Sequence, residues 1–409
     1  MRICLLTYRG NMNSGGQGVY VCCLAKALHE LGHQVHVIAG PPYPSPPDGV
    51  KLHKLEALNL YETNSFSMLS NPLRIFTPIN LYEAAAVHIG MFPDIFTFSM
   101  RAYLRLRELM SRERYDIIHD NQTLGYGLLL AKSLGVPIVA TIHHPISVDM
   151  AASLAEVKSW LTRFRRTIFY SFLIMQGVVS RRMDRVVTVS KTSAEDAIRA
   201  FKLRQDRVRI VHNGIDTGIF RRLDHVEKEP NSLVIVGKTE DRKKGVHLLL
   251  KAVQLLKDDV DVKVKVVGKQ DADDGYRRKL VQELGIGDRV TFTGHVGADK
   301  LAQLYSSAEI AVTASLYEGF GLPAAEAMAC GTPVIATRAG ALPEIVGEHG
   351  TGILVPPADP PALAAAIKRL LADKQLRQRM GDAARKRIEE SFSWEGAARK
   401  TLEVYQEVL

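Results

Sequence analysis

Short apolar runs alternate with amphipathic stretches along most of this chain. In the first half, β-branched and aliphatic residues gather into runs that resemble buried strands. The stretch between the first two runs has apolar residues at helical spacing and stops at Gly32. This alternation is typical of parallel α/β units, in which a helix follows each strand and covers the sheet. We predict strands over residues 2–8, 33–40, 115–121, 136–144 and 184–190.

The same alternation restarts in the second half and then becomes purely helical after Pro361. The pattern predicts two doubly wound, Rossmann-like domains, 1–206 and 207–388, and a terminal helix within 389–409 that packs back on the first domain. Doubly wound sheets bind ligands at the carboxyl ends of their strands, so we expect the two domains to face a central cleft. The second set of strands is predicted over residues 232–238, 262–268, 289–296, 309–315, 332–337 and 352–359.

Charge is distributed unevenly between the two halves. The net charge is +9, and residues 1–205 hold 23 Lys and Arg against 15 Asp and Glu, whereas the remainder hold 30 against 29. An anionic partner larger than a metabolite should therefore meet the first half. We expect no nucleic-acid partner.

The cysteines and the apolar runs bear on location. Four cysteines show no metal-ligand spacing, and two of them are adjacent, which favours a reducing cytosol over a disulfide framework. The N-terminal apolar run is short, and no apolar segment reaches the roughly 20 residues of a membrane span. We expect a cytoplasmic protein, with peripheral contact to a membrane left open.

The stretch SLYEGFGLPAAEAMACGTPVIA places two acids, Glu318 and Glu326, around a glycine turn that follows a predicted strand. The turn glycines would let backbone amides approach a ligand, and Pro323 suits the first turn of a helix. A helix N-terminus favours a phosphate, and carboxylates on either side could accept hydrogen bonds from hydroxyl groups. A sugar and a ribose flanking a diphosphate fit this layout. The alternative is a helix-dipole acid and a solvated loop acid.

Three other loops follow predicted strands. The sequence GKTEDRKKG offers four cations within seven residues, including Lys238 and Lys244, which could neutralise a leaving diphosphate without a metal. The loop NSGGQG, with Gly16, could approach a phosphate but lacks the dinucleotide-binding glycine spacing. In TIHH, His143 is either a site residue or a structural hydrogen-bonding group.

Taken together, these segments resemble the family-four retaining glycosyltransferases of the GT-B fold. The resemblance covers nearly the whole chain and is carried by SGGQGVYV, VATIHH, RIVHNGIDTGIF, VGKTEDRKKG and, above all, EGFGLPAAEAMACGTPVIA. It implies transfer of a hexose-type sugar, with retained configuration, from a nucleotide diphosphate sugar to a hydroxyl acceptor. A uridine diphosphate sugar is the expected donor, and no cofactor or metal is expected. A lipid-linked or cell-envelope glycan is one acceptor considered.

The resemblance also implies roles for individual residues. Glu318, His143, Lys238 and Lys244 would be catalytic, with a lysine at 238 where the family usually has an arginine. Glu326 would take the ribose hydroxyls. The donor-binding set would comprise Gly16, Lys238, Lys244, Val296, Glu318, Gly319, Phe320, Gly321, Leu322 and Glu326.

Other functions remain open at this point. A nucleotide-sugar epimerase can share the architecture, and so can a transferase for small acceptors of the sucrose-phosphate-synthase type. A phosphorylase or an inactive nucleotide-sugar-binding subunit are further alternatives. Because no carboxylate nucleophile is obvious, we favour a front-face mechanism in which the leaving phosphate assists acceptor deprotonation.

One basic segment, residues 158–185, has an aromatic and aliphatic centre too short to span a bilayer and carries seven basic residues against one acid. It could form a helix on an anionic membrane surface. The alternative is a helix buried against the sheet with its arginines in solvent.

Overall fold

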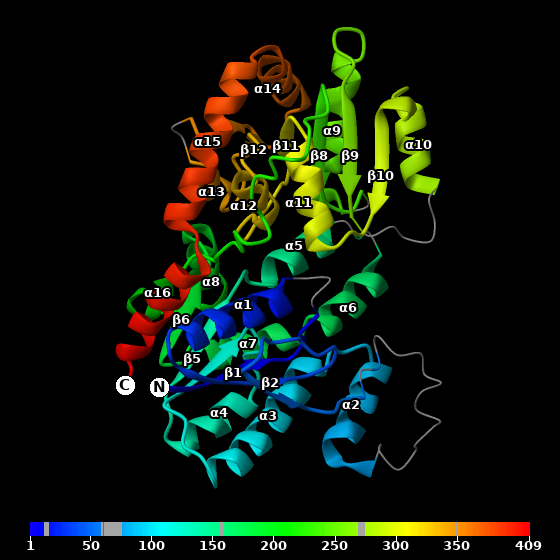
Figure 1. Ribbon diagram of the computed structural model, residues 1–409. Helices are drawn as coiled ribbons and strands as arrows, with labels where there is room; N and C mark the ends of the chain where they lie inside the picture. The colour runs from blue at the N-terminus through cyan, green and yellow to red at the C-terminus, as the bar shows by residue number, and fades with distance from the viewer. Residues whose placement is uncertain are drawn as a thin grey trace. The chain divides into compact units, whose positions relative to one another are not determined.

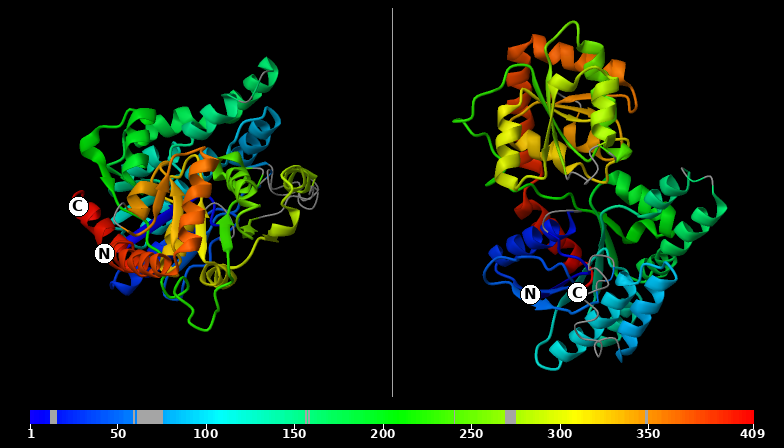
Figure 2. Two further views of the ribbon diagram at one scale, coloured as in Figure 1. Left: turned by 90° about the horizontal axis from the view of Figure 1, so that it is seen from above. Right: turned by 90° about the vertical axis from the view of Figure 1, so that its right-hand side faces the viewer.

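The computed structural model describes residues 1–11, 16–58, 60, 76–155, 157, 159–239, 241–268, 275–347 and 350–409. The chain divides into two compact units. Unit 1 comprises Met1–His212 together with Ala397–Leu409, and unit 2 comprises Asn213–Gly396. Each unit is a parallel sheet flanked by helices (Figures 1 and 2). The predicted fold class, two Rossmann-like α/β domains, is confirmed.

Over its described residues, unit 1 holds a seven-stranded sheet in the order β3-β2-β1-β4-β5-β6-β7. Its strands are β1 Arg2–Thr7, β2 Gln34–Ala39, β3 Lys51–Lys54, β4 Ile117–Asn121, β5 Ile138–Ile142, β6 Arg185–Thr188 and β7 Val208–Ile210. Its helices are α1 Gln17–Glu30, α2 Pro78–His88, α3 Asp94–Met110, α4 Gly127–Ala131, α5 Ser147–Ala155, α6 Trp160–Phe169, α7 Phe172–Ser180, α8 Lys191–Phe201 and, for most of its length, α16 Trp394–Gln406.

Over its described residues, unit 2 holds a six-stranded sheet in the order β10-β9-β8-β11-β12-β13. The strands are β8 Ser232–Val236, β9 Lys263–Val267, β10 Val290–Gly294, β11 Ile310–Thr313, β12 Val334–Thr337 and β13 Ile353–Val355. The helices are α9 Val246–Leu256, α10 Gly275–Glu283, α11 Ala298–Ser307, α12 Leu322–Ala329, α13 Leu342–Val346, α14 Pro360–Ala372 and α15 Lys374–Ser391. Short 3-10 turns occupy Lys132–Leu134, Gln205–Arg207, Arg242–Lys244 and Gly287–Arg289.

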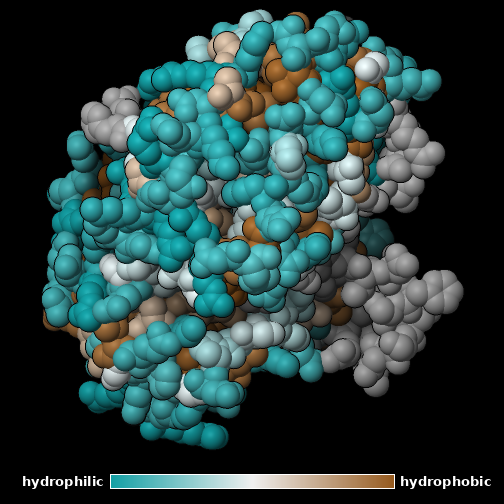
Figure 3. All heavy atoms as spheres, turned by 45° about the horizontal axis from the view of Figure 1, so that its top comes forward, coloured by the Kyte–Doolittle hydropathy of each residue, from teal (hydrophilic) through white to brown (hydrophobic). Residues whose placement is uncertain are grey.

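The apolar runs of the sequence form two separate cores. In unit 1, apolar residues of α3, α4, α7 and α8 pack on one face of the sheet, while α1 and α16 lie on the other face (Figure 1). In unit 2, α9 and α14 pack on the sheet. Because both faces of each sheet are covered, the central strands are buried almost throughout and their sequences are mainly apolar, although β4 ends in His119, Asp120 and Asn121. On the face drawn in Figure 3, hydrophilic residues cover most of the surface and hydrophobic ones form small separate groups.

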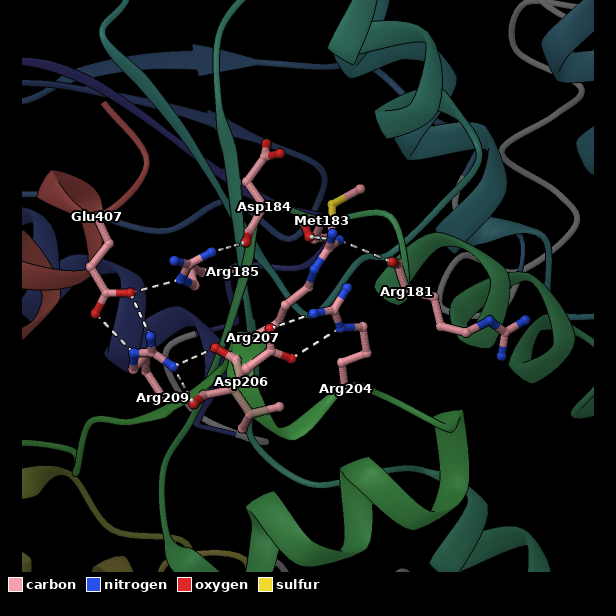
Figure 4. A network of polar contacts seen from close by, with 10 residues as sticks. Arg181, Met183, Asp184, Arg185, Arg204, Asp206, Arg207, Arg209 and Glu407 are labelled. Atoms are coloured by element: carbon pink, nitrogen blue, oxygen red, sulfur yellow. Dashed lines mark hydrogen bonds and ion pairs between the residues drawn. The ribbon is translucent and has the colours of Figure 1, made fainter.

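The end of the chain is anchored in unit 1 by polar contacts (Figure 4). Glu407 accepts hydrogen bonds from Arg185 Nε at 2.7 Å and from Arg209 Nε and Nη2 at 2.8 and 2.7 Å. Deeper in the unit, the hydroxyl of Tyr405 lies 2.5 Å from Nδ1 of His119 on β4. These contacts hold α16 and the residues that follow it against the first sheet.

The basic segment 158–185 forms two helices, α6 and α7, joined by a turn at Tyr170 and Ser171. Six residues of α7 are buried, whereas no residue of α6 is buried. Burial against the sheet is therefore right for α7 and wrong for α6, because the apolar centre of the segment belongs to the second helix.

Candidate functional site

In unit 2 the direction of strand addition reverses beside β8. β8 pairs with β9 on one side and with β11 on the other, so the chain leaves β8 and β11 in opposite directions. A crevice for ligands forms at such a switch point, outside the carboxyl ends of the two strands. The lysine-rich loop follows β8, and the loop with Glu318 follows β11. The two motifs singled out in the sequence therefore flank the same switch point.

Direct backbone contacts join these two loops. The amide of Leu316 donates to the carbonyl of Lys243 at 2.7 Å. Gly245 has φ 67°, and a Cβ on it would lie 1.8 Å from the carbonyl oxygen of Ala314. Only glycine permits both this conformation and this close approach. The lysine loop and the glutamate loop thus form one structural unit.

Lys244 and Glu318 form an ion pair within this unit. Nζ of Lys244 lies 2.8 Å from Oε1 of Glu318, and the hydroxyl of Ser315 donates to the same oxygen at 2.8 Å. Glu318 is only 8% exposed. Its carbonyl accepts from the amide of Ala341 at 2.9 Å, and Gly340 packs so closely that a Cβ would meet this carbonyl at 2.1 Å. Because Glu318 is buried and accepts two hydrogen bonds, the Lys244–Glu318 pair has little freedom to rearrange.

The turn from β11 into α12 presents the predicted donor-binding backbone. Gly321 precedes the helix with φ 103°, and Leu322 and Pro323 open its first turn. The ring of Phe320 is buried and meets that of Phe392 edge-on at 6.0 Å, so this side chain anchors the turn. Together with Gly319, these residues lie beside the N-terminal end of α12, where the helix dipole favours an anion.

Glu326 lies on α12, one turn beyond Leu322. The hydroxyl of Tyr305, a buried residue of α11, donates to Oε2 of Glu326 at 3.3 Å. Burial raises the pKa of Glu326 to about 8, opposed by the Tyr305 hydrogen bond. A carboxyl in such a place readily exchanges hydrogen bonds with hydroxyl groups, whichever protonation state it adopts.

Lys238 and Val296 stand at the same edge of the sheet. The ends of β8, β9 and β10 are joined by hydrogen bonds from the Gly237 amide to the Val267 carbonyl at 2.8 Å and from the Gly268 amide to the Gly294 carbonyl at 3.1 Å. Lys238, next to Gly237, is exposed, and Val296, two residues beyond Gly294, is half-buried.

His143 follows β5 in unit 1. Its Nε2 lies 2.7 Å from Oδ1 of Asn121, whose Nδ2 in turn donates to the carbonyl of Gln17 at 3.3 Å. With the amide so oriented, Nε2 carries the proton and Nδ1 keeps its lone pair. Burial, with a smaller effect of His144 and His119, lowers the pKa of His143 to about 3, so the ring is neutral near pH 7. The ring of Tyr20 meets it edge-on at 4.6 Å.

Two residues missed in the sequence support His143. Asn121 fixes its ring, and Oε1 of Gln122 accepts from the His143 amide at 2.8 Å. Gln122 and Leu124 have φ of 56° and 51°, rare for residues with side chains, and such strain is concentrated at functional sites. The signal was the polar run HDNQT at the end of an apolar strand, although nothing in it reveals its partner.

Gly16, with φ 72°, immediately precedes α1 in the connection that follows β1. Asn13, Ser14 and Gly15 of the same loop lie outside the described residues. Gly16 and His143 belong to unit 1, and the remaining predicted site residues belong to unit 2. Within the described ranges, no group of three or more His, Cys, Asp or Glu side chains could hold a metal ion.

Comparison with known proteins places the chain in a family. Residues 14–218 match Glycosyltransferase Family 4, and residues 219–387 match Glycosyl transferases group 1. The chain is 41% identical over 412 residues to the MMP α-(1→4)-mannosyltransferase of Mycolicibacterium hassiacum, covering 100% of this chain and 98% of that protein.

Two further proteins are similar over almost the full length. A D-inositol 3-phosphate glycosyltransferase of Paenarthrobacter aurescens is 29% identical over 428 residues, covering 98% of this chain and 95% of that protein. The structure of sucrose-phosphate synthase from Thermosynechococcus elongatus superposes with a TM-score of 0.76 at 26% identity, covering 100% of this chain and 98% of that one. The chain therefore belongs to the family-four glycosyltransferases of the GT-B fold.

Proposed function

We propose that this glycosyltransferase moves a hexosyl group from a nucleoside diphosphate sugar to a hydroxyl acceptor, with retained configuration and without a metal ion. The observation that carries the proposal is the Lys244–Glu318 pair, fixed beside the N-terminus of α12 at the switch point of the second sheet. Cation, carboxylate and helix terminus together match the diphosphate and the hydroxyl groups of such a donor.

Each group of the donor has a candidate partner. Lys244 and Lys238 would neutralise the diphosphate, aided by the backbone of residues 319–322. A phosphate contact by Gly16 stays a prediction. Both contacts of Glu318 use Oε1, so we assign Oε2 to a sugar hydroxyl. Glu326 would take the ribose hydroxyls, and Val296 would lie near the base.

The state of Glu318 supports a front-face reaction. A carboxylate that already accepts from a lysine and a serine is a weak nucleophile, because both contacts stabilise its negative charge. In the proposed step the bond from the anomeric carbon to the β-phosphate oxygen breaks and the acceptor oxygen bonds to that carbon. The acceptor proton passes to the departing phosphate oxygen. Neutral His143 would orient a hydroxyl group through Nδ1.

The sugar and the acceptor are proposed from the names of relatives and from the family resemblance. We take mannose as the first sugar to test because the 41% identical relative is named a mannosyltransferase. We retain uridine as the first base and guanosine as its competitor. For the acceptor we propose a lipid-linked or cell-envelope glycan, which would place the enzyme peripherally at the cytoplasmic face of a membrane. A small acceptor is the second candidate, because the other two relatives are named for inositol 3-phosphate and sucrose phosphate.

Nucleotide-sugar screening tests the donor. A ligand present at about 100 times its Kd adds about 2.7 kcal/mol to the free energy of unfolding, so the correct donor should stand out in a thermal-shift panel of uridine and guanosine sugars. Transfer to a panel of glycan, inositol phosphate and lipid-linked acceptors follows, with NMR of the product's anomeric proton. Absence of any donor-dependent shift, or a new epimer formed from donor alone, would refute the proposal. Inverted product or a glycosyl group trapped on Glu318 would refute the front-face step.

A further inference from the structure

Helix α6 presents its apolar side outward. Trp160, Leu161 and Phe164 are 77%, 45% and 56% exposed, although they fall within one arc of the helix when residues are placed every 100°. Ordinarily an amphipathic helix of a globular protein turns such an arc toward the core. Beyond the turn, Ile174 of α7 is 73% exposed as well.

The opposite side of α6 attaches it to unit 1. The guanidinium of Arg166 donates from Nη1 to Ser153 of α5, reaching its hydroxyl at 2.9 Å. At the end of the helix, the ring of Phe169 lies 5.5 Å from that of Phe92 and 6.5 Å from that of Phe172. The helix is thus held by a polar contact and by its last aromatic ring. Its exposed apolar arc is not used to hold it.

The charged residues of α6 are all of one sign. Between Trp160 and Phe169 the helix carries three arginines and no acid. Arg163 and Arg165 of α6 are exposed on either side of the apolar arc. Pairing of two such faces about a two-fold axis would bring the arginines of both copies together, which disfavours self-association. A lipid bilayer offers anionic phosphate groups above an apolar interior. It is therefore complementary both to the arginines and to the apolar arc of α6.

We propose that α6 docks the enzyme on an anionic lipid bilayer, with Trp160, Leu161 and Phe164 entering the headgroup region and Arg163 and Arg165 meeting lipid phosphates. Aromatic side chains favour this interface, and arginines extend from apolar surroundings toward headgroups. The biological purpose of this docking rests on the proposed function. The test of membrane docking is independent of the proposed function, because vesicle binding requires neither donor nor acceptor.

The test is co-sedimentation of the full chain with vesicles of phosphatidylcholine alone or mixed equally with phosphatidylglycerol. The apolar variant is Trp160→Ala with Phe164→Ala, matched to Ile89→Ala with Leu255→Ala, which alters exposed apolar residues elsewhere, 65% and 56% exposed. We expect binding to the anionic vesicles only. The affinity for anionic vesicles should fall at least about ten-fold in the α6 variant and stay within about two-fold of the wild type in the control.

A second pair of variants reverses charges instead of removing apolar side chains. Arg163→Glu with Arg165→Glu should weaken binding by at least about 25-fold, since each cation near an anionic surface contributes about five-fold. Lys374→Glu with Arg379→Glu, on exposed positions of α15, is its matched control. Raising the salt from about 0.1 M to about 1 M shortens the screening length from about 10 Å to about 3 Å and should also weaken binding.

Tryptophan fluorescence provides a second readout. The chain has two tryptophans, Trp160 and Trp394, and the blue shift that anionic vesicles cause should vanish in Trp160→Phe. No binding at either salt concentration, or equal losses in variants and controls, would overturn the proposal. So would a change of oligomeric state in the α6 variants without vesicle binding by the wild type. Transfer to a water-soluble acceptor should survive the α6 changes; its absence in the wild type would count against the proposed function alone.

Discussion

The substitution Glu326→Gln tests the half-buried carboxyl of Glu326 on α12. In the native unit, burial raises the pKa of Glu326 from 4.5 to about 8, with only the hydroxyl of Tyr305 at 3.3 Å in opposition. Glutamine keeps the shape of the side chain and an oxygen that can accept from Tyr305, but it cannot ionise. The variant therefore isolates the free energy of placing a negative charge at this position.

The sign and size of the effect follow from proton linkage. Between about pH 4.5 and about pH 8 the folded chain retains a proton that the unfolded chain has released, so the free energy of unfolding falls as pH rises through this window. At about 1.36 kcal/mol per pH unit, full burial would amount to about 5 kcal/mol. Glu326 is partly exposed, so solvent screening reduces the expected loss to about 1–3 kcal/mol.

Thermal unfolding at a series of pH values from about 5 to about 9 measures this loss. The wild type should lose stability across the window relative to Glu326→Gln, by about 2–4 °C in Tm for each kcal/mol. Glu283→Gln, at an exposed position of α10, is the control and should follow the wild type. Parallel profiles for wild type and Glu326→Gln would refute the reasoning, because the carboxyl would then ionise as it does in water.

Three further results are expected. Glu318→Ala should lower kcat by about 10²–10³-fold while changing donor Kd much less, measured by steady-state kinetics and titration; the reverse pattern would contradict its assigned role. Tyr405→Phe removes the contact with His119 and should cost about 1–3 kcal/mol in denaturant unfolding, with donor Kd unchanged; wild-type stability would show that the contact contributes nothing. Activity should persist after dialysis against EDTA, and a loss restored by added Mg²⁺ would reject metal independence.

The elements that were predictable are those that bury apolar runs. The central strands of both sheets were predicted because their sequences are mainly apolar. β3, with the sequence KLHK, was missed because it is a short edge strand whose residues are half-buried or exposed. β7 was also absent from the predicted strands, because it has only three residues and none of them is buried. The segment 158–185 was taken as one helix because its basic ends hid the turn between α6 and α7.

The site was predictable where its chemistry is contiguous in the chain. Glu318 and the lysine loop each follow an apolar strand, which placed them at a strand end, and Glu326 lies on the helix that comes next after the Glu318 loop. The sequence did not indicate that Lys244, of four cations, pairs with Glu318, because that choice depends on the packing of Gly245 against the second loop.

The support of His143 depends on strand pairing. Asn121 lies opposite Thr141 in the register of β4 and β5, which brings it to the histidine two residues further on. A sequence without a known register does not contain this information.

Calorimetric titration of the preferred nucleotide sugar into wild type, Lys244→Met and Arg242→Met tests the central claim most directly. Lys244 is paired to Glu318 at 2.8 Å, whereas Arg242, two residues earlier in the same loop, is exposed. We predict that Lys244→Met binds the donor at least about ten-fold more weakly, since a charge-assisted hydrogen bond to phosphate is worth about 1.5–3 kcal/mol. Arg242→Met should bind the donor like the wild type. Equal donor affinity in wild type and Lys244→Met would contradict the role of Lys244 in holding the diphosphate.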